Sequence, residues 1–296
     1  MKKIAILLDS TCDMSLELLN KYKLDYIKMG VTIGEETYEA DLGWESLSSP
    51  SKFYQLMREG KRPLTNAISE VEFNRVFNNY LDNGYDVLYI GCSSALSSSV
   101  KTGKKVASDI MNKRTDCRIL VVDPLISGMG QGLIGIKASE MRESGKSIDE
   151  IVAYLEENKL CFNQWGTVDN LKYLKDAGRV KAGAAFFGNI IGIKPIIISD
   201  INGQNFAYKK VRGRKASLEE IINSVVETAV EPEENYFAIT HADAEEEANY
   251  IKDAVMKRVK FKDAFVTNLG PILGASCGPK TLIAFNFGKK VTLLGE

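Results

Sequence analysis

Hydroxyl and thiol side chains gather in three short stretches of this sequence, each beside a predicted strand or helix end. The first stretch contains Thr65, the second Ser97 and Ser98, and the third Ser276 and Cys277. Hydroxyls beside the unpaired backbone N–H groups of a helix N-terminus can hold a carboxylate or a phosphate. A serine or cysteine with an activating base could instead act as a nucleophile. These five residues are therefore the candidate binding or catalytic side chains.

Part of this pattern has a simpler structural explanation. Ser69 and Glu72 have the spacing of a capping box at the start of a helix. Ser97 or Ser98 could likewise do no more than cap the helix that is predicted to follow, and the local pattern does not decide between a cap and a binding site. Thr65 precedes the capping serine and has no such explanation.

A nucleophilic site would need partners that the sequence supplies poorly. Ser98 and Lys101 match the S-x-x-K pattern of some acyl-transferring serine enzymes, but the accompanying S-D-N and K-T-G motifs are absent. His241 is the single histidine, so a Ser-His-Asp triad or a His-rich metal site must include it or not exist. A hydrogen-bonding role is favoured for His241. A serine- or cysteine-dependent hydrolase or acyl transferase is the alternative to a binding protein.

Glycines after one predicted strand suggest a nucleotide site only weakly. Gly128, Gly130 and Gly132 have the spacing G-x-G-x-G, whereas a dinucleotide fingerprint needs G-x-G-x-x-G and a downstream acid. A tight strand-to-helix turn is the better interpretation. No metal and no cofactor is predicted.

Composition excludes several classes of protein. The net charge of −1 gives no electrostatic basis for binding nucleic acid. Five cysteines are scattered, odd in number and never spaced as C-x-x-C, which argues against disulfides and zinc and favours a reduced, cytoplasmic protein. The longest apolar run, 182–199, is interrupted by Asn189, Lys194 and Pro195, so we expect a buried helix and strand and no integral membrane segment.

The elements that must position these residues change in rhythm along the chain. Up to about residue 160, apolar strand-like runs alternate with segments of helical spacing, which predicts an α/β domain with a mostly parallel sheet, residues 1–160. Residues 161–296 read as an α+β domain. In it we expect a β-hairpin around Asn202 and Gly203, and a capped helix starting near Ser217.

Seven motifs in order resemble the DegV family, bacterial proteins that bind a fatty acid. "DSTCD" resembles the family's D-S-T-x-D, "LTNAIS" stands at its T-S-Q-P-S, and "SSALSSS" resembles S-S-x-L-S-G-T. "VVDPLISGMGQG" is similar to D-S-x-x-x-S-x-G-x-G, "LKYLKDAGRV" to L-x-x-L-x-x-x-G-R-I, and "IGIKPII" to its K-P-I continuation. "LGPILGASCGPKTL" resembles G-P-V-I-G-x-H-T-G-P-G-A-L. The order and spacing, more than any one motif, carry the resemblance.

The resemblance implies an N-terminal α/β domain, a C-terminal DegV-type α+β domain and a long-chain fatty acid in a tunnel between them. Thr65 and Ser97 then correspond to hydroxyls that hold the carboxylate. The family also implies presentation of the acid to a separate kinase, which makes acyl phosphate for phospholipid synthesis. Arg179 and the region of Arg212 and Arg214 resemble positions that meet this kinase. The apolar run 182–198 is a possible tunnel wall, or simply core.

Departures from the family pattern cluster at the expected head-group pocket. Ser276 and Cys277 stand where the family has His-Thr, and Lys280 stands where it has glycine. Ser98 replaces the glycine of L-S-G-T. These changes leave a carrier of a different amphiphile as a further alternative.

Overall fold

The N-terminal half is built on a parallel sheet, as the alternating pattern predicted. The computed structural model describes residues 2–181 and 192–295, and it places β1 at the centre of a four-stranded sheet of order β2-β1-β6-β7. These strands are nearly continuous apolar runs because helices cover both faces of the sheet. Their bounds are β1 Lys3–Asp9, β2 Asp25–Ile27, β6 Tyr85–Ile90 and β7 Ile119–Val122.

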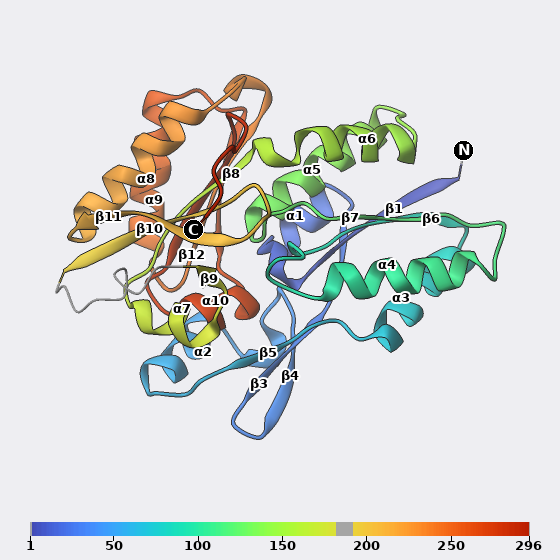
Figure 1. The fold of residues 1–296 in the computed structure, drawn as a ribbon, viewed down its shortest axis with the longest axis horizontal. Coiled ribbons are helices and arrows are strands. Elements are labelled where there is room, and N and C mark those ends of the chain that lie inside the picture. Colours follow the sequence, from blue (N-terminus) through green and yellow to red (C-terminus); the bar gives the residue numbers. More distant parts are fainter. Residues whose placement is uncertain (1, 182–191, 296) are drawn as a thin grey trace.

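Two pairs of helices cover this sheet (Figure 1). α3 (Glu70–Asp82) and α4 (Ser99–Met111) pack on one face, and α5 (Met129–Glu143) and α6 (Ile148–Asn158) pack on the other. Half of the predicted capping box at Ser69 is present: the Ser69 hydroxyl accepts the N–H of Glu72 at 3.2 Å, while the Glu72 carboxylate pairs with Arg75. Ser147 and Glu150 form a complete capping box on α6.

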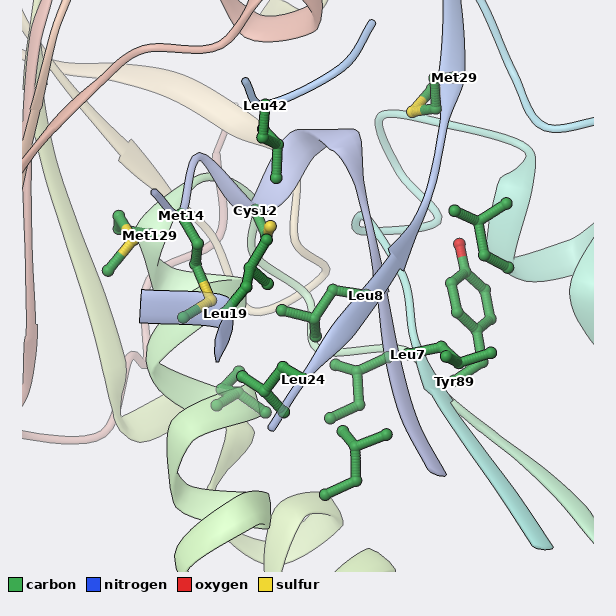
Figure 2. Packing of buried hydrophobic residues seen from close by; sticks show 14 of the residues in the cluster. Leu7, Leu8, Cys12, Met14, Leu19, Leu24, Met29, Leu42, Tyr89 and Met129 are labelled. Carbon is green, nitrogen blue, oxygen red and sulfur yellow. The ribbon is translucent and has the colours of Figure 1, made fainter. Parts of the chain in front are cut away.

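The turn after β1 is anchored by side chains that face inward. Leu8, Cys12 and Met14 belong to one buried cluster with Leu19 of α1 (Leu16–Lys21) and Met129 at the start of α5, part of which Figure 2 shows. All of these side chains are at most 4% exposed. Their burial fixes the carboxyl end of β1, from which the site described below is built.

A small antiparallel sheet of order β4-β3-β5 was not predicted. The chain leaves the parallel sheet after Ile27 and enters the antiparallel one at Met29. The Ser10 hydroxyl accepts the Met29 N–H at 2.9 Å and donates to the Ile27 carbonyl at 3.4 Å, so it holds this crossing. The bounds are β3 Met29–Ile33, β4 Glu36–Ala40 and β5 Leu64–Asn66, with α2 (Pro50–Arg58) between β4 and β5.

The C-terminal half contains a mixed sheet of order β13-β12-β14-β8-β10-β11-β9. α8 (Arg214–Thr228) and α9 (Glu245–Arg258) pack on it, and α5 also contacts it, so α5 touches both large sheets (Figure 1). The strands are β8 Phe162–Thr167, β9 Val180–Lys181, β10 Ile193–Ser199, β11 Asn205–Arg212, β12 Tyr236–His241, β13 Asp263–Asn268 and β14 Leu282–Phe287. α7 (Leu171–Ala177) and α10 (Pro271–Cys277) are short helices.

Two local predictions in this half have different outcomes. The hairpin around Asn202 and Gly203 is confirmed, since β10 and β11 pair antiparallel. The helix start at Ser217 is wrong: α8 begins at Arg214 after Gly213, and the Ser217 hydroxyl donates back to the Arg214 carbonyl at 2.7 Å. A serine that bonds the carbonyl three residues earlier is compatible with a helix interior, so the S-x-x-E spacing was misleading.

The glycine-rich stretch after β7 is a tight turn into α5, as predicted. Gly128 has φ of +64° immediately before the helix. A Cβ on Gly130 would lie 2.4 Å from Ile126 Cδ1, so the backbone here packs against the core. These glycines therefore allow close packing of strand and helix.

The fold class predicted from the sequence is confirmed: an α/β half with a parallel sheet precedes an α+β half with a mixed sheet. Within the described ranges, no helix is both long and apolar enough to cross a bilayer. Residues 182–191 of the predicted tunnel wall lie outside the described residues. The remainder, in β10, is core: Ile196 and Ile197 are at most 6% exposed and are absent from the lining of the cavity described next.

Candidate functional site

A cavity of about 840 Å³ opens at the carboxyl ends of β1, β6 and β7. This is the edge of a parallel sheet where ligands generally bind, and the volume is within the roughly 300–1,000 Å³ of small-molecule sites. α7 and α10, from the C-terminal half, supply the facing wall. The apolar residues that line the cavity as a whole are Met29, Ala67, Ala95, Leu96, Val100, Leu174, Ile272 and Leu273.

The structure brings the five candidate side chains together on this cavity. Thr65, Ser97, Ser98, Ser276 and Cys277 all line it, although they come from β5, the start of α4 and the end of α10. An adjacent hollow of about 420 Å³ shares Thr65 and Ser276 with it. The two hollows therefore adjoin on the side of β5.

Several of these hydroxyls are available to a ligand. Within residues 2–181 and 192–295, the side chains of Thr65, Ser98 and Ser276 have no hydrogen-bond partner. Ser97 is different: its hydroxyl accepts the N–H of Ser99 at 3.2 Å and lies 3.1 Å from the Ser99 hydroxyl. The Ser97 hydroxyl therefore holds the N–H of Ser99, the first residue of α4, and lines the cavity at the same time, whereas the N-cap residue Ser98 makes no side-chain capping bond.

The N-terminus of α4 adds backbone donors to this wall. Val100 and Lys101 lie in its first turn and line the cavity, and their N–H groups have no acceptor in the described part of the chain. A thirteen-residue helix also places partial positive charge at this end. The arrangement suits an anionic group.

Three further charged residues line the cavity, of which the sequence analysis considered only Lys101, as part of the S-x-x-K match. Lys101 and Lys104 lie on the first two turns of α4, and Asp123 follows β7. The Asp123 carboxylate accepts the N–H groups of Ser94 and Leu125, both at 3.2 Å. For Asp123 the sequence carried a signal, because residues just after parallel strands meet at one edge of the sheet.

Ser276 and Cys277 are the last two residues of the short helix α10. The Thr281 hydroxyl bonds the Cys277 and Gly278 carbonyls at 3.1 and 2.8 Å and so satisfies the C-terminal end of this helix. Burial, with a smaller contribution from the Asp13 carboxylate, raises the pKa of Cys277 to about 12. The thiol is therefore protonated at neutral pH and a weak nucleophile.

Asp13 connects the turn after β1 to α10. Its Oδ1 accepts the N–H of Gly270 at 2.8 Å, and the side chain is 1% exposed. Oδ2 has no partner among the described residues. Desolvation, reinforced by the Asp9 charge and opposed by the Gly270 hydrogen bond, raises the pKa of Asp13 well above its usual value. The buried surroundings of this carboxyl group, next to the site, therefore favour its protonated form.

Asp13→Asn is expected to stabilise the fold, by a margin that grows as the pH rises above about 4. A carboxyl whose pKa is raised on folding contributes its stability below the unfolded-state pKa and loses it as the pH rises toward the folded-state pKa. Asparagine removes that loss, keeps the acceptor for Gly270 and tolerates the local φ of +52°. Urea unfolding of the wild-type protein and of Asp13→Asn between pH 4 and 8 measures the difference in their free energies of unfolding. A difference that is constant or shrinks as the pH rises contradicts the raised pKa of Asp13.

Lys280 has the backbone conformation of the glycine that the family pattern places there. Its φ is +64°, in the left-handed region that costs non-glycine residues roughly 1–2 kcal/mol. Lys280→Gly is therefore expected to raise the free energy of unfolding by about 0.5–1 kcal/mol, after the entropy cost of glycine. Urea denaturation measures this. Lys280→Ala removes the side chain but keeps the strain, so it should give no such gain; equal gains in both variants would contradict the backbone explanation.

The single histidine does not contribute to the described lining of the cavity. His241 is not among its lining residues, and its Nδ1 accepts the N–H of Ala244 at 3.4 Å, before α9. Burial lowers the pKa of His241, so the ring is neutral at pH 7. No group of three or more His, Cys, Asp or Glu side chains suited to a metal ion occurs in the described ranges.

The three candidate docking arginines lie in different environments. Arg179 is exposed at the cavity, and its Nε donates to the Leu96 carbonyl at 3.3 Å. Arg212 is exposed at the end of β11, away from the cavity lining. Arg214 binds Glu247 through two hydrogen bonds of 2.9 and 2.6 Å and also donates to the Lys280 carbonyl at 2.8 Å. Its charge is therefore already paired within the chain.

The chain is similar to known proteins over almost its whole length. The family model described as "Uncharacterised protein, DegV family" matches residues 3–287. A DegV domain-containing protein of Clostridium perfringens is 31% identical over 288 residues, which cover 97% of this chain and 98% of the relative.

Solved structures of similar chains have the same fold. A DegV lipid-binding protein of Thermotoga maritima has 26% identity and a TM-score of 0.85, with 98% of this chain and all of that chain covered. DegV of Bacillus subtilis, described as a fatty acid binding protein, has 26% identity and a TM-score of 0.82 over the same shares of the two chains. A fatty-acid-binding DegV family protein of Thermus thermophilus has 25% identity and a TM-score of 0.87, with 97% of this chain and all of that chain covered. With the match over residues 3–287 and 31% identity to the clostridial relative, this protein belongs to the DegV family.

Proposed function

We propose that this protein is a non-catalytic carrier of a long-chain fatty acid, bound in the 840 Å³ cavity between its two halves. The single observation that carries the proposal is the convergence of Thr65, Ser97, Ser98, Ser276 and Cys277 on one cavity. Relatives of the same fold that bind fatty acids support it.

The carboxylate of the ligand would lie between Thr65 and the start of α4. The Thr65 hydroxyl has no partner in the described part of the protein, and Ser97 and the first-turn N–H groups of α4 supply further donors. Hydrogen bonds to a charged group contribute roughly 1.5–3 kcal/mol each, so two or three suffice to offset the burial of one carboxylate. Ser276 and Cys277 would contact the head group from the opposite wall.

The acyl tail would supply most of the affinity. Each buried methylene contributes about 0.8 kcal/mol, so a sixteen-carbon chain gains on the order of 10 kcal/mol. Ile272, Leu273 and Leu174 provide apolar surface at the cavity.

Denaturing extraction of the purified protein, followed by mass spectrometry, tests this function. We expect a long-chain fatty acid in the extract, or uptake of added palmitate or oleate by protein from which lipid has been removed. Absence of any bound acyl chain together with no uptake of either acid would refute the proposal.

We further propose that the carrier is cytoplasmic and presents its ligand to a separate kinase that forms acyl phosphate for phospholipid synthesis. The five cysteines are free, in keeping with a reducing compartment. Arg179, Arg212 and Arg214 are the proposed docking residues, with Arg214 acting mainly through its support of the loop at Lys280.

Arg212→Glu should reduce acyl phosphate formation by the kinase while leaving palmitate affinity unchanged. Full kinase turnover with this variant would exclude Arg212 from the docking surface.

One observation favours an alternative in which Ser98 acts as a nucleophile. Ser98 and Lys101 line the same cavity, and the Ser98 hydroxyl has no partner among the described residues. Labelling with a serine-directed fluorophosphonate probe discriminates the two functions: a carrier should remain unlabelled, whereas an acyl-transferring enzyme should be modified at Ser98. Because Lys101 and Lys104 line the cavity, a different anionic amphiphile is a further candidate ligand, which the extraction would identify.

A further inference from the structure

The loop that presents Ser97 is organised around a single buried serine. Ser93 is 0% exposed, and its carbonyl accepts the N–H groups of Leu96 and Ser97 at 2.9 and 3.0 Å. Its hydroxyl accepts the N–H of Ala95 at 3.3 Å and donates to the Gly203 carbonyl at 2.9 Å. The turn that ends at Ser97 therefore depends on a contact with the tip of the β10–β11 hairpin, which belongs to the other half of the chain (Figure 1).

The hairpin tip is held in shape by hydrogen bonds that do not involve this loop. One Asp200 carboxylate oxygen accepts the N–H groups of Asn202 and Gln204, both at 2.9 Å, and the other accepts the N–H of Gly295 at 3.1 Å. The Gly203 N–H donates to the Asp200 carbonyl at 2.9 Å. Five residues of the tip and the C-terminal segment are thereby fixed as one unit.

The contact between tip and loop admits no additional atom. Gly203 has φ of +74°, and a Cβ there would lie 2.3 Å from the Ser93 hydroxyl and 2.7 Å from the Cα of Leu125. Because the second neighbour is backbone, a side chain at Gly203 would have to displace the tip from the loop. The close packing of Gly203 against the loop and the hydrogen bond from Ser93 to its carbonyl thus occur at the same residue.

A second contact holds the same loop from its other end. Arg179 donates to the Leu96 carbonyl, and the Gln204 side chain donates to the Arg179 carbonyl at 3.4 Å. Hairpin tip, Arg179 and serine loop therefore form a continuous set of hydrogen bonds across the two halves. Its effect is to set where Ser97 and the first turn of α4 lie relative to Thr65.

We infer that Ser93 and Gly203 are positioning residues for head-group recognition. The inference rests on the proposed fatty-acid-carrier function. The two residues do not line the cavity, so they act through Ser97 and α4. Loss of their contact should weaken recognition of the carboxylate and leave binding of the tail unchanged.

The test compares the affinities of hexadecanoic acid and of its methyl ester, which has the same tail and no charge. Wild-type protein should prefer the acid by at least about tenfold, which corresponds to one hydrogen bond to a charged group. Ser93→Ala should lose about tenfold in affinity for the acid, with the ester affinity unchanged, because only the head-group donors are displaced. Ser139→Ala is the matched control, since Ser139 is also buried and donates to a distant carbonyl, that of Tyr22, away from the cavity.

A second pair of variants keeps the test decisive if Ser93→Ala is poorly folded. Gly203→Ala should reproduce the selective loss. Gly213→Ala should retain the preference, because Gly213 also has a positive φ but no atom of the described residues lies within 4 Å of the place its Cβ would take. Equal losses for acid and ester, or an unchanged preference in Ser93→Ala and Gly203→Ala, would overturn the inference. If wild-type protein binds neither compound, the carrier function itself is refuted, which is a distinguishable result.

Discussion

Asp9→Asn is expected to lower the free energy of unfolding by about 3 kcal/mol or more, because a buried charged acceptor loses part of its hydrogen-bonding capacity. Asp9 is 0% exposed at the end of β1. One carboxylate oxygen accepts the N–H and hydroxyl of Thr11 at 3.0 and 2.5 Å. The other accepts the Tyr89 hydroxyl at 2.8 Å and the Cys92 N–H at 2.9 Å. An amide replaces one of these oxygens with an NH₂ group, which would face two donors.

Asp13→Asn is the matched comparison, because the same substitution four residues away should have the opposite sign. Asp13 accepts one hydrogen bond, and its other oxygen has no partner among the described residues, so an amide fits there. Urea denaturation of both variants at pH 7 measures the two effects. A loss below about 1 kcal/mol for Asp9→Asn, or a loss of similar size in both variants, would contradict this account of the two aspartates.

The double variant Thr65→Val, Ser97→Ala is expected to weaken palmitate binding by about 100-fold or more. Each substitution removes a donor to the carboxylate, and two such hydrogen bonds contribute about 3 kcal/mol or more in total. Thr65→Val keeps the shape of a side chain in β5, and Ser97→Ala removes one hydrogen bond, from the Ser99 N–H, at a cost of about 1 kcal/mol. The apo protein should therefore remain folded. Titration calorimetry with palmitate gives the affinity.

Ser69→Ala is the control for that experiment. It also removes a serine hydroxyl that accepts an N–H in the first turn of a helix, that of Glu72, but Ser69 is not part of the cavity lining. It should lose comparable stability and keep wild-type affinity. If the double variant binds palmitate as tightly as Ser69→Ala, the carboxylate is not held by Thr65 and Ser97.

The sequence was sufficient for the parallel sheet because its strands are buried on both faces and read as continuous apolar runs. Ile4, Ala5 and Ile6 in β1 are typical. The antiparallel sheet was missed because β4 and β5 are short and mostly exposed, so they carry no apolar periodicity. The passage of the chain from one sheet to the other at Lys28 depends on the Ser10 hydroxyl, whose partners are distant in sequence. Such long-range contacts have no local signature.

Candidate site residues were found where small polar side chains end a strand or begin a helix. Thr65, Ser97 and Ser276 were recognised in this way and do converge on one cavity. Lys101 and Lys104 were not predicted to bind a ligand because lysines in an amphipathic helix usually face solvent, and only the position of α4 at the cavity distinguishes them. The role of Arg214 could not be predicted either, since its partner Glu247 lies 33 residues away on another helix.

A crystal structure of the protein in complex with palmitate tests the central claim most directly. The account predicts continuous density for the acyl chain in the cavity, with the carboxylate within about 3 Å of the Thr65 and Ser97 hydroxyls. A carboxylate bound instead by Lys101 and Lys104, or an acyl chain outside this cavity, would contradict it.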